Sequence, residues 1–345
     1  MSFKVLMRVD AGPIAGYGHF MRSLALAQAL RRKGHDVLFV SQALSDSLVA
    51  GLKRQKLTVR RLESGLPLRE DALATSRMAV AESCRWIVMD GYSFDTEYQR
   101  LLKKGGSLLF CIDELADRRQ LADIVLNQTH DAENLFTYNT EQGAVLLLGS
   151  RYALLREEFL RRGRAVHPPK PRNRNILITM GAGDRHNQAA RVIEAIATVN
   201  QGRWRVKIVA GDVNPNERLL RRLIAGLNGS NELVGSNGNM PTLMTWADLA
   251  VSAGGSTCWE ICFLGLPAIL ISTAANQRFI ASSLHASGCA LHLGRHEEVV
   301  IPQIAEAVSR LMEDPARRTT MSRRGREIVD GAGADRAVAA MEEFS

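Results

Sequence analysis

Residues 4–40 read KVLMRVDAGPIAGYGHFMRSLALAQALRRKGHDVLFV, and this stretch decides the fold class. A β-prone run at 4–9 leads into a glycine-bearing loop at 10–18. Apolar residues then recur at helical spacing from Phe20 to Arg32, and Gly34 ends the helix before a second strand at 36–40. Strand, loop, helix and strand in this order are the repeating unit of a parallel, doubly wound α/β sheet.

The same pattern starts again in the second half of the chain. Apolar runs predict buried strands at 86–89, 107–112 and 123–126, and then at 175–180, 205–209, 249–251 and 268–271. A glycine loop at 181–184 and an apolar-periodic helix at 189–199 follow the strand at 175–180, as in the first half. Between the halves, 168–171 holds three prolines in four residues, which disfavour a helix and predict a linker.

These boundaries predict two Rossmann-like domains that face each other across a cleft, the usual place for a ligand. The predicted ranges are a first domain at 1–165, a linker at 166–174, a second domain at 175–330, and a C-terminal helix at 331–345, with packing back on the first domain as one option. A length of 345 residues fits two domains, and 46% hydrophobic residues argue against extensive disorder.

Charge and cysteine content narrow the class of protein. The net charge of +8 is compatible with nucleic acid, a membrane surface or a phosphorylated small molecule as the partner. Five cysteines without CxxC spacing argue against a disulfide framework or a structural zinc site, and favour a reducing cytoplasm. The apolar stretch at 262–271 is far too short to cross a bilayer, so we expect a soluble protein without stable membrane insertion.

The first glycine loop reads GPIAGYGH at 12–19. It is neither a dinucleotide fingerprint, because Met21 stands where the third glycine is needed, nor a phosphate-binding P-loop, because no Gly-Lys-Ser/Thr follows. His19 falls at the predicted helix start, where the helix dipole disfavours a charged imidazolium, so it is a candidate general base. A histidine that only caps the helix or packs on the sheet is the alternative.

The second glycine loop reads SAGGST at 252–257 and follows a strand. Backbone amides at the start of the next helix form an anion site suited to a diphosphate. Glu260 lies one turn into that helix, where a carboxylate can accept hydrogen bonds from both ribose hydroxyls. The alternative is an ordinary β-α-β crossover with a glycine turn, but the two glycines, two hydroxyls and carboxylate together favour nucleotide binding.

With both loops in view, the sequence resembles the GT-B nucleotide-sugar enzymes, which carry GxGH in the first domain and GG-S/T-x-x-E-x-x-x-x-G-x-P in the second. Within that group it is most similar to the UDP-2,4-diacetamido-2,4,6-trideoxy-β-L-altropyranose hydrolases of pseudaminic acid biosynthesis and to related spore-coat polysaccharide biosynthesis proteins. The matching segments are 8–10, 16–19, 89–92, 112–114, 123–127, 152–159, 180–184 and 252–277. The run YALLREEF at 152–159 is the most specific of them.

The resemblance implies a role for each matching residue. His19 would be the base that activates water, Tyr92 and Asn276 would line the sugar site, and Asp10 would lie beside the same cleft. Glu260 would hold the uridine ribose. The other implied nucleotide or substrate contacts are Gly16, Gly18, Gly181, Gly183, Asp184, Ser252, Gly254, Gly255, Ser256, Thr257 and Gln277. No metal ligands and no cofactor are expected.

Two departures from the family pattern concern the specificity of the site. The family commonly has Met-Gly-Gly-x-Asp where this chain has Met-Gly-Ala-Gly-Asp at 180–184. It often has Glu-Asn-Gln where this chain has Ala275 followed by Asn276 and Gln277. The first change predicts a reshaped diphosphate loop, and the second removes one negative charge beside the sugar.

The sequence therefore predicts a hydrolase of a UDP-linked deoxy-amino sugar in nonulosonic acid or surface-glycan biosynthesis. The alternatives are a glycosyltransferase that uses a UDP-sugar donor and a non-catalytic nucleotide-sugar-binding partner of a larger synthase. We expect a UDP-sugar as ligand, no nucleic acid, and other enzymes of the same pathway as an optional partner class. The surplus arginines at 317–326 are expected on the solvent-facing side of a C-terminal helix.

Overall fold

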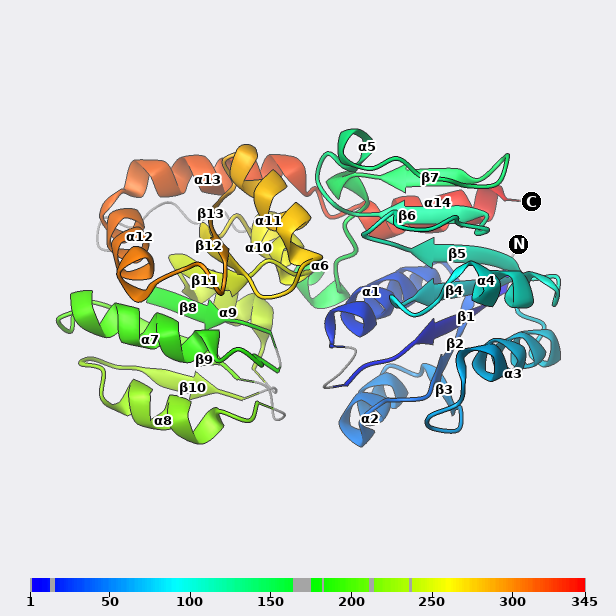
Figure 1. Ribbon diagram of the computed structural model, residues 1–345, viewed down its shortest axis with the longest axis horizontal. Helices are drawn as coiled ribbons and strands as arrows, with labels where there is room; N and C mark the ends of the chain where they lie inside the picture. The colour runs from blue at the N-terminus through cyan, green and yellow to red at the C-terminus, as the bar shows by residue number, and fades with distance from the viewer. Residues whose placement is uncertain are drawn as a thin grey trace. The chain divides into compact units, whose positions relative to one another are not determined.

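The computed structural model describes residues 2–12, 16–163, 175–181, 183–210, 214–235 and 238–344. The chain divides into two compact units (Figure 1). Unit 1 comprises Met1–Glu157 and Gly331–Ser345, and unit 2 comprises Glu158–Asp330. The predicted linker at 166–174 lies outside the described residues. Each unit is an α/β sandwich around one parallel sheet.

Unit 1 is built on a seven-stranded sheet of order β3-β2-β1-β4-β5-β6-β7, in which every pair of neighbours is parallel. Its strands are β1 (Lys4–Val9), β2 (Asp36–Ser41), β3 (Thr58–Arg61), β4 (Trp86–Asp90), β5 (Leu108–Ile112), β6 (Ile124–Asn127) and β7 (Val145–Leu148). Its helices are α1 (Gly18–Arg32), α2 (Asp46–Arg54), α3 (Leu68–Ala81), α4 (Thr96–Lys103), α5 (Ala132–Leu135) and α14 (Gly333–Glu343), with a 3₁₀ turn η1 (Ser150–Tyr152).

The alternation of side chains along β1 explains how this sheet is covered. Val5, Met7 and Val9 are fully buried and belong to the core shared with α1, α2 and α14. Leu6 belongs to the opposite core, which the helices α3 and α4 cover. Arg8 follows on that second face with only 2% of its surface exposed, so a strand of period two places a cation inside the sandwich.

Unit 2 is built on a six-stranded parallel sheet of order β10-β9-β8-β11-β12-β13. Its strands are β8 (Asn175–Thr179), β9 (Arg205–Val209), β10 (Glu232–Val234), β11 (Leu249–Ala253), β12 (Ala268–Ser272) and β13 (Ala290–Arg295). Its helices are α7 (Gln188–Val199), α8 (Glu217–Ala225), α9 (Met240–Trp246), α10 (Thr257–Leu264), α11 (Gln277–Ala286), α12 (Ile301–Glu313) and α13 (Pro315–Ile328). The helix α6 (Glu157–Arg162) spans the boundary between the units.

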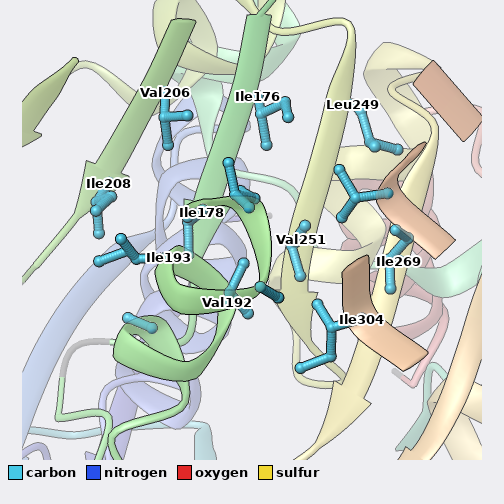
Figure 2. Packing of buried hydrophobic residues seen from close by; sticks show 14 of the residues in the cluster. Ile176, Ile178, Val192, Ile193, Val206, Ile208, Leu249, Val251, Ile269 and Ile304 are labelled. Carbon is cyan, nitrogen blue, oxygen red and sulfur yellow. The ribbon is translucent and has the colours of Figure 1, made fainter. Parts of the chain in front are cut away.

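The core of unit 2 lies between its sheet and the helices α7, α8 and α12. Figure 2 shows Ile176 and Ile178 of β8 beside Val251 of β11, with Ile193 of α7 packed on them. All four are almost completely buried. The branched side chains of the central strands thus fill the layer under α7, as expected for strands covered on both faces.

Every strand predicted from the sequence is present, with boundaries shifted by a residue or two. The strands that the sequence did not predict are β3, β7, β10 and β13, which are the two edges of each sheet. Edge strands are covered less completely: β3 is mostly exposed, and the first two residues of β7 are exposed. β3, which reads TVRR, and β10, which reads ELV, therefore lack the long apolar run that marks a central strand, whereas β7 reads VLLL and was missed despite its apolar run.

The expectation of a solvent-facing arginine surface on the C-terminal helix is wrong in part. Arg318 is 3% exposed and donates hydrogen bonds to the carbonyl oxygens of Leu311 and Met312 at the end of α12. Arg324 donates to the carbonyl oxygen of Ser287, the C-cap residue of α11, over 3.4 Å. A guanidinium at a helix C-terminus interacts favourably with the helix dipole. Part of the positive charge of the chain therefore stabilises unit 2.

No helix in the described ranges combines the length and the apolar character that a membrane span requires. The five cysteines are all buried free thiols.

Gly333→Ala is expected to destabilise unit 1. A Cβ at Gly333, the first residue of α14, would lie 2.6 Å from the backbone nitrogen of Ala153 and 2.5 Å from the carbonyl carbon of Tyr152. Because backbone atoms cannot turn aside as a side chain can, α14 has to shift away from η1, at a cost of about 3 kcal/mol. Urea unfolding measures this loss. The matched control is Gly51→Ala in α2, where a Cβ meets only the flexible end of Arg54 at 3.8 Å and stability should not fall.

Candidate active site in unit 1 and nucleotide loops in unit 2

The predicted site residues gather at the switch point of each sheet, where the strand order reverses. In unit 1 the reversal lies between β1 and β4, and in unit 2 it lies between β8 and β11. The loop that leads to His19 follows β1, and the Gly254–Gly255 turn follows β11. Open α/β sheets bind ligands at the carboxyl ends of their strands beside this reversal. The topology therefore places the loops where a ligand is expected.

His19 occupies the first turn of α1 and is 9% exposed. Its Nδ1 lies 2.5 Å from Oδ1 of Asp90, the last residue of β4. The backbone hydrogen bonds between Gly12 and Gly16, of 2.8 and 3.3 Å, close the loop that precedes the helix, and Gly16 adopts a φ of 78°. Gly18 is the first residue of α1. The first turn of α1 thus holds His19 beside Asp90 at the end of β4.

The contacts around the imidazole ring assign its tautomer. Nη2 of Arg22 lies 2.9 Å from Nδ1 of His19, but a guanidinium can only donate and an ionised carboxylate can only accept. Nδ1 therefore carries the proton and donates it to Asp90, while Arg22 donates to the same carboxylate oxygen over 2.7 Å. In the neutral ring, Nε2 then carries the lone pair, and it makes no hydrogen bond to any residue that the structure describes. A histidine in this state is competent as a general base.

Asp90 is a functional residue to which the sequence interpretation gave no role. Its side chain is fully buried and accepts from four donors: His19 Nδ1, Arg22 Nε and Nη2 at 2.7 Å each, and Ser23 Oγ at 3.1 Å. Burial alone favours the neutral carboxyl, but the Arg22 guanidinium and His19 outweigh it and hold the pKa of Asp90 below its usual range. The available signal was an acidic residue at the end of a buried strand next to β1.

Tyr92 and Glu114 complete the surroundings of His19. The Tyr92 ring packs edge-on against the imidazole, with centroids 4.6 Å apart, and its hydroxyl donates to Glu114 Oε2 over 2.6 Å. Burial and the neighbouring Glu114 raise the pKa of Tyr92, so its phenol stays protonated. Glu114 also pairs with Nη1 of Arg22. The structure thus brings the predicted residue Tyr92 into contact with His19.

Asp10 lies at the same edge of the sheet, and its carboxylate is fully engaged. Oδ1 accepts from Ser41 Oγ at 2.7 Å and from the backbone amides of Gln42 and Ala43 at 2.8 and 3.1 Å. Oδ2 pairs with Arg8 over 2.9 Å. Although burial opposes ionisation, the Arg8 guanidinium and these donors lower the pKa of Asp10. Asp10 therefore fixes the ends of β1 and β2 against each other.

Three consecutive amides are available at the second glycine loop. The amides of Cys258 and Trp259 donate to the carbonyl oxygens of Gly255 and Ser256 at 3.0 and 3.1 Å. The amides of Gly255, Ser256 and Thr257, just before and at the start of α10, make no hydrogen bond within the described ranges. Such amides at a helix N-terminus bind anions. That these amides bind a diphosphate stays a prediction.

The two glycines of this loop have different surroundings. A Cβ at Gly254 would lie 3.0 Å from the carbonyl oxygen of Gln277, so Gly254 allows α11 to approach the loop. A Cβ at Gly255 would meet nothing nearer than Nε2 of Gln277 at 3.8 Å. Ser252, by contrast, is 1% exposed, and its hydroxyl donates to the carbonyl oxygen of Ala253. The loop is thus open to a ligand at Gly255, whereas Ser252 is buried.

The remaining predicted residues of unit 2 lie on α10 and at the starts of α11 and α7. Glu260 is in the first turn of α10 and is partly exposed. Asn276 is the N-cap residue of α11, and the Gln277 side chain accepts from the Thr273 amide and hydroxyl at 2.8 and 3.1 Å. Gln277 thereby holds its own loop in place while its Nε2 lies beside Gly255.

Asp184 caps a helix. Its two carboxylate oxygens accept from the backbone amides of Gln188 and Ala189, each over 2.8 Å, at the start of α7. Burial raises the pKa of Asp184 despite these two donors. Gly181 has a φ of 83°, and a Cβ at Gly181 or Gly183 would meet no other atom within 4 Å. Ala182, which replaces the second glycine of the family pattern, lies outside the described residues.

Within the described ranges, no group of three or more histidine, cysteine, aspartate or glutamate side chains is arranged to hold a metal ion.

The second half of the chain matches a known family model, and longer parts of the chain are similar to individual proteins. Residues 175–333 match the model of the glycosyltransferase family 28 C-terminal domain. The chain is 28% identical over 57% of its length to the spore coat polysaccharide biosynthesis protein SpsG of Bacillus subtilis, and covers 58% of that protein. It is 25% identical over 83% of its length to the UDP-2,4-diacetamido-2,4,6-trideoxy-β-L-altropyranose hydrolase of Campylobacter jejuni, and covers 97% of it. The chain is a distant homologue of both.

Solved structures extend the likeness over the whole chain. Acinetobacter baumannii MurG superposes with a TM-score of 0.68 at 15% identity, with full coverage of both chains. The calicheamicin glycosyltransferase CalG4 superposes with a TM-score of 0.64 at 16% identity. The chain has the GT-B fold. The family 28 match covers the second half of this GT-B chain, from residue 175 to residue 333.

Proposed function

We propose that this GT-B protein hydrolyses a UDP-linked deoxy-amino sugar to UDP and the free sugar, in nonulosonic acid or surface-glycan biosynthesis. The observation that carries the proposal is the His19–Asp90 pair, with Nδ1 bound over 2.5 Å and Nε2 left to accept a proton. The hydrolase of Campylobacter jejuni, which the chain matches over most of both lengths, supports the choice of reaction.

The reaction needs only groups that the chain supplies. Nε2 of His19 takes a proton from water while the water oxygen bonds to the anomeric carbon, on the face opposite the diphosphate. The bond from that carbon to the diphosphate oxygen breaks, the configuration inverts, and UDP leaves with the electron pair. The open amides at Gly255, Ser256 and Thr257 would stabilise the negative charge that develops on the diphosphate.

The family resemblance suggests the binding roles. Glu260, partly exposed in the first turn of α10, would accept from the ribose hydroxyls of UDP. Tyr92 in unit 1 and Asn276 in unit 2 would contact the sugar. Because Asp10, Asp184 and Gln277 are engaged in holding their own loops, we assign them to shaping the site rather than to direct contact with the substrate.

A second candidate is a glycosyltransferase, because residues 175–333 match a glycosyltransferase family model. A transferase can use the same base and nucleotide loop and differs only in the hydroxyl group that attacks the anomeric carbon.

Incubation with UDP-linked deoxy-amino sugars in water alone separates the two candidates. We expect UDP and free sugar of inverted configuration to form without any acceptor, which NMR of the anomeric proton detects directly. UDP release that begins only after an acceptor alcohol is added would replace the hydrolase by the transferase.

Gly255→Ala is expected to weaken UDP binding at least tenfold without loss of stability. The new methyl group meets only Gln277 Nε2 at 3.8 Å within the protein, but it occupies the space from which a diphosphate approaches the amides. Calorimetric titration with UDP and thermal unfolding measure the two effects. Gly254→Ala is the matched variant: its methyl group meets the Gln277 carbonyl oxygen at 3.0 Å, so it should lower stability as well. Unchanged UDP affinity in Gly255→Ala would exclude this loop as the diphosphate site.

A further inference from the structure

The loop between β4 and α4, residues 91–95, leads from Asp90 to the first turn of α4. Within this loop Phe94 alone is buried, with 5% of its surface exposed, and it belongs to the core under α3 and α4. Tyr92, whose ring packs on His19, lies two residues before Phe94 and is 40% exposed. One apolar side chain therefore anchors in the core of unit 1 a loop that is otherwise partly or fully exposed.

The Phe94 ring packs against two buried side chains, Tyr98 and Arg8. It stacks on the Tyr98 ring, with centroids 4.6 Å apart and an angle of 29° between the planes. The guanidinium carbon of Arg8 lies over the Phe94 ring, 5.1 Å from its centroid. Tyr98 and Arg8 are 1% and 2% exposed. The face of an aromatic ring attracts a cation, and the attraction is stronger where water is excluded.

The Arg8 guanidinium has one nitrogen without a hydrogen-bond partner. Its Nε and Nη2 donate to Asp71, and Nη2 also pairs with Asp10. Nη1 is buried and makes no hydrogen bond to any residue that the structure describes. A buried donor without a partner is costly, and the electron-rich face of Phe94 lies over the same guanidinium. The contact with Arg8 thus requires an aromatic side chain at position 94.

Gly91 lies against the Phe94 ring at the other end of the loop. The three atoms nearest to a Cβ added at Gly91 all belong to this ring, at 2.9, 3.3 and 3.5 Å. The φ of Gly91 is not positive, so its backbone would accept an alanine, and the ring is what excludes one. The lack of a side chain at position 91 therefore allows the ring to fold back on its own loop.

We propose that Phe94 is a positioning residue of the sugar site: its ring fixes the loop at 91–95 and thereby places the Tyr92 ring beside His19. The contact of Tyr92 with the sugar rests on the proposed function, but the positioning of Tyr92 does not. The alternative is that hydrogen bonds from the Tyr92 hydroxyl to Glu114 and from Arg118 to the Tyr92 carbonyl oxygen hold the loop, and that Phe94 merely fills the core.

The direct test is the nuclear Overhauser contact between the ring protons of Tyr92 and His19, whose centroids are 4.6 Å apart. Tyr92→Leu and His19→Gln assign the signals. In Phe94→Leu, which keeps an apolar side chain and removes the ring, we expect the contact to disappear. Phe110→Leu is the matched control, because Phe110 of β5 is fully buried in the opposite core of unit 1, and it should keep the contact. A folded Phe94→Leu variant that retains the contact would overturn the proposal, and thermal unfolding verifies folding.

Gly91→Ala reaches the Phe94 ring without removing it. The new methyl group displaces the ring, so the contact between Tyr92 and His19 should weaken in this variant too, and should do so even if Phe94→Leu does not fold. Combined with Phe94→Leu, the methyl group no longer meets a ring, so the double variant should lose no more than Phe94→Leu alone. Fully additive effects would mean that the two positions act independently, which contradicts the proposal.

Turnover measures the consequence for the substrate. In Phe94→Leu and in Gly91→Ala we expect the KM for the UDP-sugar to rise about tenfold, with a smaller change in kcat and an unchanged affinity for UDP, whose loop belongs to unit 2. A role in filling the core would lower the active fraction without raising KM, and that result would remove Phe94 from the sugar site. If the ring contact is lost in the variants but the wild type turns over no UDP-sugar, the proposed function fails and the positioning of Tyr92 by Phe94 stands.

Discussion

His19→Ala is expected to lower the rate of UDP release about a thousandfold while leaving the affinity for UDP unchanged. The variant removes Nε2, the atom that we propose takes the proton from water, but it leaves the amides of the second glycine loop untouched, because these belong to unit 2. Single-turnover measurement of UDP release checks the rate, and calorimetric titration with UDP checks the affinity.

The control for His19→Ala is His285→Ala, which changes an exposed histidine at the end of α11. It should keep the wild-type rate. Full turnover in His19→Ala would remove His19 from the mechanism. A simultaneous loss of UDP binding would instead mean that the substitution damages more than the base.

Asp90→Asn is the second substitution with a large expected effect, because Asp90 determines which nitrogen of His19 carries the proton. An asparagine amide can donate to Nδ1, and the ring proton then moves to Nε2, where the ring can no longer act as a base. A loss of about 10³- to 10⁴-fold in kcat is expected from the tautomer change. Arg22 also loses a buried ionic partner, so the free energy of unfolding should fall by about 3 kcal/mol.

Asp71→Asn is the matched control. Asp71 is also a buried carboxylate of unit 1 that binds two nitrogens of a buried arginine, in this case Arg8. Its loss should cost a similar free energy of unfolding but leave kcat per folded molecule near the wild-type value, because Asp71 does not contact His19. If both variants lose activity in proportion to their stability, the Asp90 effect is structural and the tautomer argument fails.

The central part of each sheet was predictable because its signal is local. Strands covered on both faces need continuous apolar runs, and β1, β4, β8 and β11 each show one. The edges were not predictable in this way: β3 reads TVRR and β10 reads ELV, and both depend on a neighbouring strand to be recognised as strands. Pairing across a sheet is not visible in a window of a few residues.

The same distinction between local signals and contacts of distant segments applies to the residues of the candidate site. The two glycine loops and His19 were found from spacing, because a strand, a tight loop and a helix are consecutive in the chain. Asp90 and Glu114 were not, because Arg22 meets them across 68 and 92 residues of sequence. Sequence spacing contains no information on such contacts, and only the sheet order β1-β4-β5 brings them together.

By itself, the sequence determined the alternation of strands and helices, the two glycine turns and the position of a histidine at a helix start, since these follow from backbone preferences and hydrophobic periodicity over short distances. The tertiary structure alone decided which partners each charged side chain has. It places the ionised carboxylate of Asp90 at Nδ1 of His19. It also engages Asp10, Asp184 and several arginines in hydrogen bonds to backbone groups, which stabilise the fold. The physical reason is that burial makes an unpaired charge costly, so charges find their partners only when the fold brings distant segments together.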